Sequence, residues 1–134
     1  GACSTGLWVK DLTGESVFEA LKNRRTYACA GGEVAMWVAA NGVGMGEIGQ
    51  SKRPVEVNVN VASQVAIDRV SLWVDGGWAE HRKVDAKRAE LTFLDDRSGP
   101  GEQYYFVRIQ THQPEEYPKG PIISYSSPVY LTLT

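Results

Sequence analysis

The side chains in this sequence that could perform catalysis have a spacing that matches no common catalytic motif. The two histidines, His81 and His112, have no carboxylate at a fixed spacing that would make either one a metal ligand or a general base. The serines between Ser124 and Ser127 lack the G-x-S-x-G elbow of a hydrolase nucleophile. We therefore expect both histidines at the surface and predict no catalytic residue and no metal ligand.

Three other features resemble ligand sites only in part. The segment DDRSGPGE at 95–102 offers carboxylates and glycines, but it lacks the D-x-D-x-D-G spacing of a calcium loop, so a solvated turn is expected. The segment GVGMG at 42–46 follows a hairpin signal and opens no helix, which argues against phosphate binding. Cys3 and Cys29 match no zinc motif, so unpaired thiols are expected, with a disulfide between them as the alternative. The sequence thus predicts no cofactor.

Two pairs of residues are the candidate ligand-binding or partner-binding residues. Arg24 and Arg25 follow a predicted helix, where arginines commonly bond the last free carbonyls; alternatively they face a neighbouring domain or an anionic ligand. Trp73 and Trp78 flank the turn formers at 75–77, and they could form an exposed aromatic platform for a sugar or a protein. Ordinary packing in the sheet is the favoured interpretation of both tryptophans, because tryptophan buries a large area wherever it lies.

The elements that must position these residues begin with a short helix. Thr13 is a suitable N-cap, and a helix is expected from about Gly14 to Asn23. Val17, Phe18 and Leu21 fall on one side of this helix. We therefore expect that side to pack against a sheet.

The rest of the chain has the alternating pattern of β-strands. The most regular run is VEVNVNV at 55–61, which places four valines on one face and polar side chains on the other. Asn41-Gly42 is a strong signal for a type I′ hairpin turn. Further strands are expected at 26–30, 34–39, 43–47, 70–74, from about 79, 88–94, 104–109 and 129–134. No second helical pattern separates these strands, so the sequence predicts a mainly β fold, an antiparallel β-sandwich of about seven or eight strands with one short N-terminal helix.

The totals describe one globular domain. A length of 134 residues suits a single β-sandwich domain over 1–134. A net charge of −2 provides no broad attraction for nucleic acid or an anionic membrane, and no run approaches the about 18 apolar residues of a membrane span. No nucleic-acid or membrane partner is expected. Because the first residue is Gly1 and not methionine, we interpret the chain as a fragment of a longer protein.

Five short motifs occur in order along nearly the whole chain. They are Thr5-Gly6 followed by Trp8; Leu12-Thr13 leading into ALKNRRTYACAG at 20–31; NGVGMGE at 41–47; YYFVRIQ at 104–110; and SSPVYLT at 126–132. In this combination the chain resembles the C-terminal β-sandwich region of PHP-superfamily proteins, the polymerase and histidinol phosphatase type of metal-dependent phosphoesterase. It departs from those proteins at Cys29-Ala30, where relatives often carry two threonines, and at Tyr125, where they often carry tryptophan.

The resemblance implies that a metal-binding catalytic barrel precedes this region in full-length relatives. Catalysis of that kind needs several His, Asp and Glu ligands, and this chain contains two histidines. We therefore expect a non-catalytic accessory domain that packs on the PHP-type catalytic domain of the same parent protein. The chain alone is not expected to be an enzyme, and the resemblance implies that the parent is a metal-dependent hydrolase.

The alternative hypothesis is an independent module that binds carbohydrate or protein. The two hypotheses predict different surfaces. An accessory domain should carry an exposed apolar docking face around the N-terminal arm and helix, whereas a binding module should expose Trp73 or Trp78 on a flat or concave surface.

Overall fold

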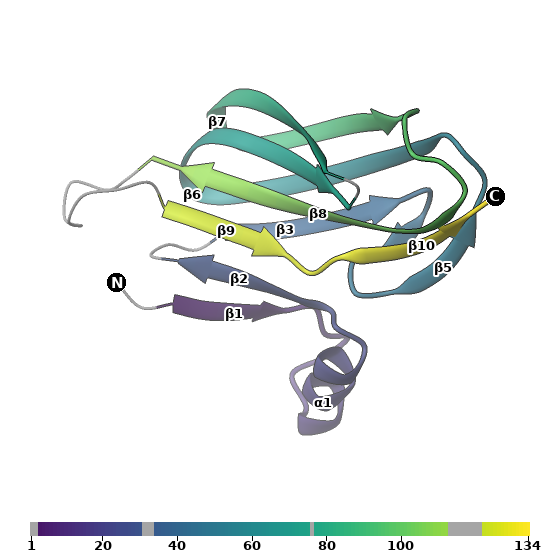
Figure 1. Ribbon diagram of the computed structural model, residues 1–134. Helices are drawn as coiled ribbons and strands as arrows, with labels where there is room; N and C mark the ends of the chain where they lie inside the picture. Colours follow the sequence, from purple (N-terminus) through teal and green to yellow (C-terminus); the bar gives the residue numbers. More distant parts are fainter. Residues whose placement is uncertain (1–2, 31–33, 76, 113–121) are drawn as a thin grey trace.

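The computed structural model of the chain describes residues 3–30, 34–75, 77–112 and 122–134. Within them the fold is mainly β with a single short helix, as the sequence predicts (Figure 1). The elements in chain order are β1 (Cys3–Leu7), α1 (Gly14–Lys22), β2 (Thr26–Ala30), β3 (Val34–Ala40), β4 (Val43–Gly44), β5 (Ile48–Ser51), β6 (Val55–Val74), β7 (Trp78–Asp95), β8 (Gly101–Thr111), β9 (Ile122–Ser126) and β10 (Val129–Leu133).

The number of strands differs from the predicted seven or eight, because the sheet of the described residues has ten. The expected strands 55–61 and 70–74 are two halves of β6, and the segments from 79 and at 88–94 are two halves of β7. None of the short strands β1, β5 and β9 is among the strands expected from the sequence. β5 pairs with β10 in parallel, so the sheet is antiparallel everywhere except at this edge.

The long strand β6 organises the sheet. Its first half pairs with β3 and its second half with β8, while β7 pairs with it along almost the whole length. The register shifts between Ala62 and Ile67 and again between Ile67 and Arg69. Such bulges bend a ribbon and increase its twist. The sheet therefore curls, and its two ends face each other as the layers of a sandwich (Figure 1).

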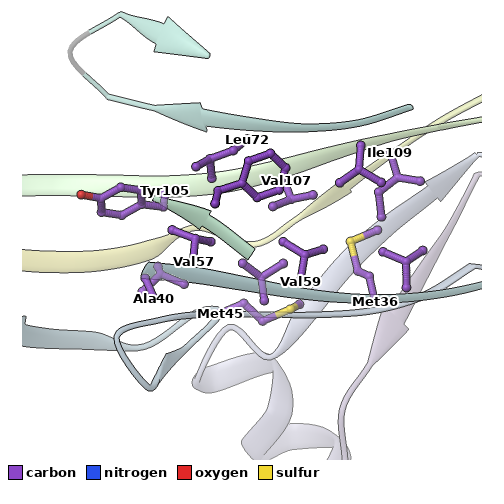
Figure 2. Close-up of a cluster of buried hydrophobic side chains, with 14 of the residues drawn as sticks. Met36, Ala40, Met45, Val57, Val59, Leu72, Tyr105, Val107 and Ile109 are labelled. Atoms are coloured by element: carbon purple, nitrogen blue, oxygen red, sulfur yellow. The ribbon is translucent and has the colours of Figure 1, made fainter. Parts of the chain in front are cut away.

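The core lies between these two layers. Met36, Val57 and Val59 of one layer face Val107 and Ile109 of the other, and all of them are buried (Figure 2). Complete burial of a side chain of this size stabilises a fold by about 1.5–3 kcal/mol. The predicted alternation of the 55–61 run is confirmed, since its four valines are buried and its polar residues exposed.

A tight hairpin joins β3 to β4, as Asn41-Gly42 predicts. Both residues have positive φ, 45° for Asn41 and 81° for Gly42, which is the requirement of a type I′ turn. The Asn41 side chain also accepts a hydrogen bond from the Glu56 amide at 2.8 Å and donates one to the Ser51 hydroxyl at 2.7 Å. This residue therefore ties the hairpin to the connection between β5 and β6.

The helix α1 begins as predicted but packs differently. The Thr13 hydroxyl accepts a hydrogen bond from the Ser16 amide at 3.2 Å, which confirms the N-cap. The expectation that Val17, Phe18 and Leu21 pack on the sheet is wrong, since Phe18 is 67% and Leu21 54% exposed. Figure 1 shows α1 standing away from the sheet beyond β1 and β2. Phe18 and Leu21 therefore lie largely in solvent, whereas Val17 is half-buried and Ala20 is buried.

The DDRSGPGE segment forms a turn built around one buried carboxylate. Asp95 is 2% exposed, and its Oδ1 accepts hydrogen bonds from the Arg97 and Ser98 amides at 3.0 Å each. The Tyr105 hydroxyl donates to Oδ2 at 2.6 Å. Burial acts to raise the pKa of Asp95, but the hydrogen bonds from Ser98, Tyr105 and Arg97 outweigh it and lower the pKa. The segment is thus a turn, as expected, and this carboxylate is charged and accepts hydrogen bonds on both of its oxygens.

Replacing Asp95 with asparagine should lower the free energy of unfolding at pH 7 by about 1.5–3 kcal/mol, because hydrogen bonds to a charged acceptor are lost. The folded-state pKa of Asp95 lies below its unfolded value, so the stability that this group contributes is present above about pH 4 and disappears as the pH falls through the folded pKa. Urea unfolding at pH 7 and pH 3 measures both effects. The gap between wild type and Asp95→Asn should narrow at pH 3, and an equal gap at both pH values would contradict this account.

Candidate functional site

The helix end places Arg24 and Arg25 at a fixed corner of the molecule. The Arg25 amide donates to the Ala20 carbonyl at 2.9 Å and the Arg24 amide to the Leu21 carbonyl at 3.3 Å, which is the hydrogen-bond pattern of a Schellman cap. Arg24 takes the left-handed conformation of this cap, with φ 58°, where glycine is the usual residue. The chain therefore turns sharply from α1 into β2.

The Arg24 side chain joins this corner to the segment after β4. Its Nε donates to the Gly46 carbonyl at 2.7 Å, rather than to a carbonyl of the helix as expected. The Gly46 amide in turn donates to the Pro128 carbonyl at 2.7 Å. A Cβ on Gly46 would lie 2.1 Å from the Arg24 carbonyl oxygen, so the two segments touch through their backbones. Arg24 thus has a structural role at this contact.

Arg25 has a different environment. Its carbonyl accepts a hydrogen bond from the Trp8 amide at 2.9 Å, and the residue is half-buried. It lines two small hollows, one of about 340 Å³ shared with Arg24 and Ile48 and one of about 310 Å³ shared with Trp8 and Trp37. Among the described residues no hydrogen bond or ion pair engages its guanidinium. The structure therefore brings the two arginines together but leaves only Arg25 with an uncommitted side chain.

Trp73 and Trp78 do not form one platform. Val74 pairs with Trp78 and Trp73 pairs with Ala79, so the two tryptophans point to opposite faces of the layer. Trp78 packs against the core, and the Arg97 guanidinium lies 4.7 Å from the centre of its ring. Both tryptophans are half-buried. Ligand binding by either residue stays a prediction, but a shared aromatic surface is ruled out by the strand register.

Trp73 instead belongs to an aromatic row on the outer face of its layer. Its ring lies parallel to that of Phe106, with 6.3 Å between the centroids, and Phe106 stacks in turn on Tyr104 at 6.4 Å. Tyr125 lies beside Phe106 at 6.5 Å. Sequence reasoning did not single out the last three residues as a surface. The sequence signal for this row was the alternation of Tyr104 and Phe106, which places both on one face of β8, together with Tyr125 in the neighbouring strand β9.

A second aromatic cluster, also not predicted as a site, lies over β3. The Trp8 ring meets the Trp37 ring edge-on at 5.7 Å and 83°, and Tyr27 lies 6.4 Å from Trp8. The Trp8 indole N–H donates to the Met36 carbonyl at 2.8 Å, which fixes the orientation of the ring. The sequence signal for this cluster was Trp37, which the alternation of β3 places on the outer face of the sheet beside the polar residues of the 55–61 strand.

Both histidines are exposed, as expected. His81 Nδ1 lies 2.6 Å from the Ser71 hydroxyl, so the two form a cross-strand hydrogen bond between β7 and β6. A serine next to a histidine is the beginning of a nucleophilic pair, which also needs a group that orients the imidazole. In the described part of the chain, no carboxylate forms a hydrogen bond or ion pair with this ring, and the Trp73 ring lies edge-on to it at 5.9 Å between the centroids. The geometry is that of a structural pair.

The cysteines and acidic residues form no metal centre in the part of the chain that the structure describes. Cys29 carries a free, buried thiol that donates to the Val34 carbonyl at 3.4 Å, so the expected unpaired state is confirmed for this residue. Burial raises the pKa of the Cys29 thiol, which keeps it protonated. The side chain of Cys3 lies outside the described residues. Within those residues, no three His, Cys, Asp or Glu side chains gather closely enough to hold a metal ion.

Comparison with protein-family models and with curated proteins finds no match for this chain. The relation to PHP-type proteins therefore stays a prediction that rests on the five motifs. No helix in the described ranges has the length and apolar character needed to cross a membrane.

Replacing Gly46 with alanine tests whether this corner is held as the geometry indicates. The change should lower the free energy of unfolding by about 2 kcal/mol or more, because φ is +84° and the new Cβ would collide with the Arg24 carbonyl. Thermal or urea unfolding measures the effect. Gly99→Ala is the matched control, since a Cβ there meets nothing within 4 Å and its φ is ordinary. Equal stability of the two variants would contradict the proposed contact.

Proposed function

We propose that this chain is a non-catalytic accessory β-sandwich domain that docks on a second folded domain through one face of α1. The observation that carries the proposal is the exposure of three apolar side chains, Leu12 just before α1 and Phe18 and Leu21 on it, together called the helix face below. Their exposed fractions are 94%, 67% and 54%. An amphipathic helix ordinarily buries its apolar side, and a helix whose apolar side stays exposed marks an interaction surface.

The energetics favour a folded protein partner for the helix face. Each large apolar side chain that becomes fully buried contributes about 1.5–3 kcal/mol, so covering Phe18 and Leu21 would add substantially to an interface. The neighbouring Ile48, 72% exposed, shares a hollow with Arg24 and Arg25 beside the end of the helix. The surface thus combines an apolar centre with an arginine at its rim, as protein interfaces commonly do.

The partner that we propose is the PHP-type catalytic domain of the same parent protein. This part of the proposal rests on the five sequence motifs alone. Two side chains that could take part in catalysis are held in structural hydrogen bonds instead, which supports a non-catalytic role. His81 bonds the Ser71 hydroxyl, and Asp95 accepts hydrogen bonds within its own turn. A sugar-binding or protein-binding module based on Trp73 and Trp78 together has less support, since these residues occupy opposite faces.

Hydrogen exchange tests the docking proposal. We expect the amides of α1 to exchange more slowly in the longer parent protein than in the isolated chain 1–134, because docking covers the helix face. Phe18→Glu should abolish this difference and should change the stability of the isolated chain by less than about 0.5 kcal/mol, since Phe18 is exposed there.

Leu94→Glu is the matched control. Leu94 is also an exposed apolar residue, but it lies on β7, and the substitution should leave the protection of α1 unchanged. Equal exchange of α1 in the isolated chain and in the parent protein would refute docking through the helix face.

A second test concerns catalysis. The isolated chain should show no phosphoesterase turnover of a p-nitrophenyl phosphate ester when manganese or zinc is added, because the proposed catalytic ligands belong to another domain. Turnover that disappears on chelation of the metal would contradict a non-catalytic role.

A further inference from the structure

A groove on the outer face of the β3, β6 and β7 layer has the composition of a ligand site and shares no residue with the helix face. Its volume is about 510 Å³, within the range of small-molecule sites. Trp8 and Trp37 line one side of it, and Asn60, Arg88 and Glu90 line the other. This set of five residues is called the Trp–Asn–Glu groove below.

The strand register explains why these residues meet. Trp37 of β3 pairs with Asn60 of β6, which pairs with Glu90 of β7, and the three side chains form one row across the sheet. The next row is Ala35, Ala62 and Arg88. The two alanines leave the floor of the groove low between the tryptophans and the polar side chains. A second hollow of about 490 Å³ shares Ala35, Ala62 and Arg88 with the groove, so the depression continues along the sheet.

The tryptophan wall is held rigidly. The hydrogen bond from the Trp8 indole to the Met36 carbonyl fixes that ring, and its edge-on contact with Trp37 sets the two indoles nearly at right angles. Trp8 is 38% exposed, so an apolar ring surface remains accessible. A rigid aromatic wall loses little conformational entropy when a ligand binds.

The polar wall is uncommitted. Among the described residues no hydrogen bond or ion pair engages the side chains of Asn60, Arg88 or Glu90. Together they supply an amide donor and acceptor, a guanidinium donor and a carboxylate acceptor. One positive and one negative charge cancel, so the groove does not favour a strongly charged ligand, and Glu90 would repel a phosphate.

We propose that the Trp–Asn–Glu groove binds a neutral pyranose oligosaccharide. A pyranose has an apolar C–H face, which suits an indole surface, and a rim of hydroxyl groups that both donate and accept hydrogen bonds. The tryptophan wall of the groove matches the C–H face, and the polar wall matches the hydroxyl groups. The extension of the groove into the second hollow suits a ligand of more than one sugar ring. A wholly apolar peptide segment would leave Arg88 and Glu90 desolvated and unpaired, which is costly. This inference does not depend on the docking role of α1.

Affinity electrophoresis tests the proposal with the chain 1–134 and four neutral polysaccharides: hydroxyethylcellulose, soluble β-1,3-glucan, arabinoxylan and galactomannan. We expect at least one of them to retard the wild-type protein. Glu90→Gln and Asn60→Ala should weaken that retardation about tenfold or more, since the first replaces a charged acceptor of sugar hydroxyl groups with a neutral amide and the second removes an amide, both at exposed positions. Ala62→Leu should do the same by filling the floor of the groove, while circular dichroism confirms that the fold is retained.

Glu56→Gln is the matched control for Glu90→Gln. Glu56 is exposed on the same outer face of β6 but does not line the groove, so the variant should bind like the wild type. The intrinsic tryptophan fluorescence should shift on addition of the retarding polysaccharide and should do so less in Trp37→Phe. The proposal is overturned if none of the four polysaccharides retards the wild type, or if Glu90→Gln and Ala62→Leu are retarded as strongly as Glu56→Gln.

Discussion

The pairing of β6 along both of its edges is the constraint on which the rest of the structure depends. This strand of 20 residues belongs to both layers, and β3 and β8 occupy different parts of it. The irregularity between Ala62 and Arg69 changes which alternate positions face inward. The buried hydrophobic residues of β6 are odd-numbered up to Ile67 and even-numbered from Val70 onward. Without this change, the second half of the strand would direct Val70 and Leu72 away from the core.

The two outer faces follow from the same alternation. While the valines of β6 fill the core, Asn60 and Ala62 must point outward beside Trp37, and Trp73 must point outward beside Phe106. One layer therefore carries a groove with polar and aromatic walls, and the other carries a row of stacked aromatic rings. No additional structural element is needed to form either surface. Both consist of the alternate residues of the strands whose other residues fill the core.

The sequence predicts those features of the fold that depend on residues close together in the chain. The valine alternation of 55–61, the Asn41-Gly42 turn and the Thr13 cap are local signals, and each appears in the structure. Features that depend on contacts between distant parts of the chain could not be predicted. The pairing of β5 with β10 joins segments far apart in the chain, and the bulge in β6 carries no turn signal. The faces of Trp73 and Trp78 depend on the exact register of a hairpin, which one residue more or fewer in the turn would reverse.

The helix shows a different limit of sequence reasoning. Its pattern correctly indicates one apolar side, but a pattern states only that this side prefers an apolar neighbour and not where that neighbour lies. In the structure α1 is anchored at its C-terminal end by Arg24. This residue adopts the left-handed backbone conformation of the cap, and its side chain donates a hydrogen bond to the Gly46 carbonyl. Glycine in this position would relieve the backbone but remove that bond. The anchor holds Phe18 and Leu21 in a fixed orientation although they do not pack on their own sheet. A surface presented rigidly costs less entropy to bind than a mobile one, so this anchoring is consistent with the docking role proposed for α1.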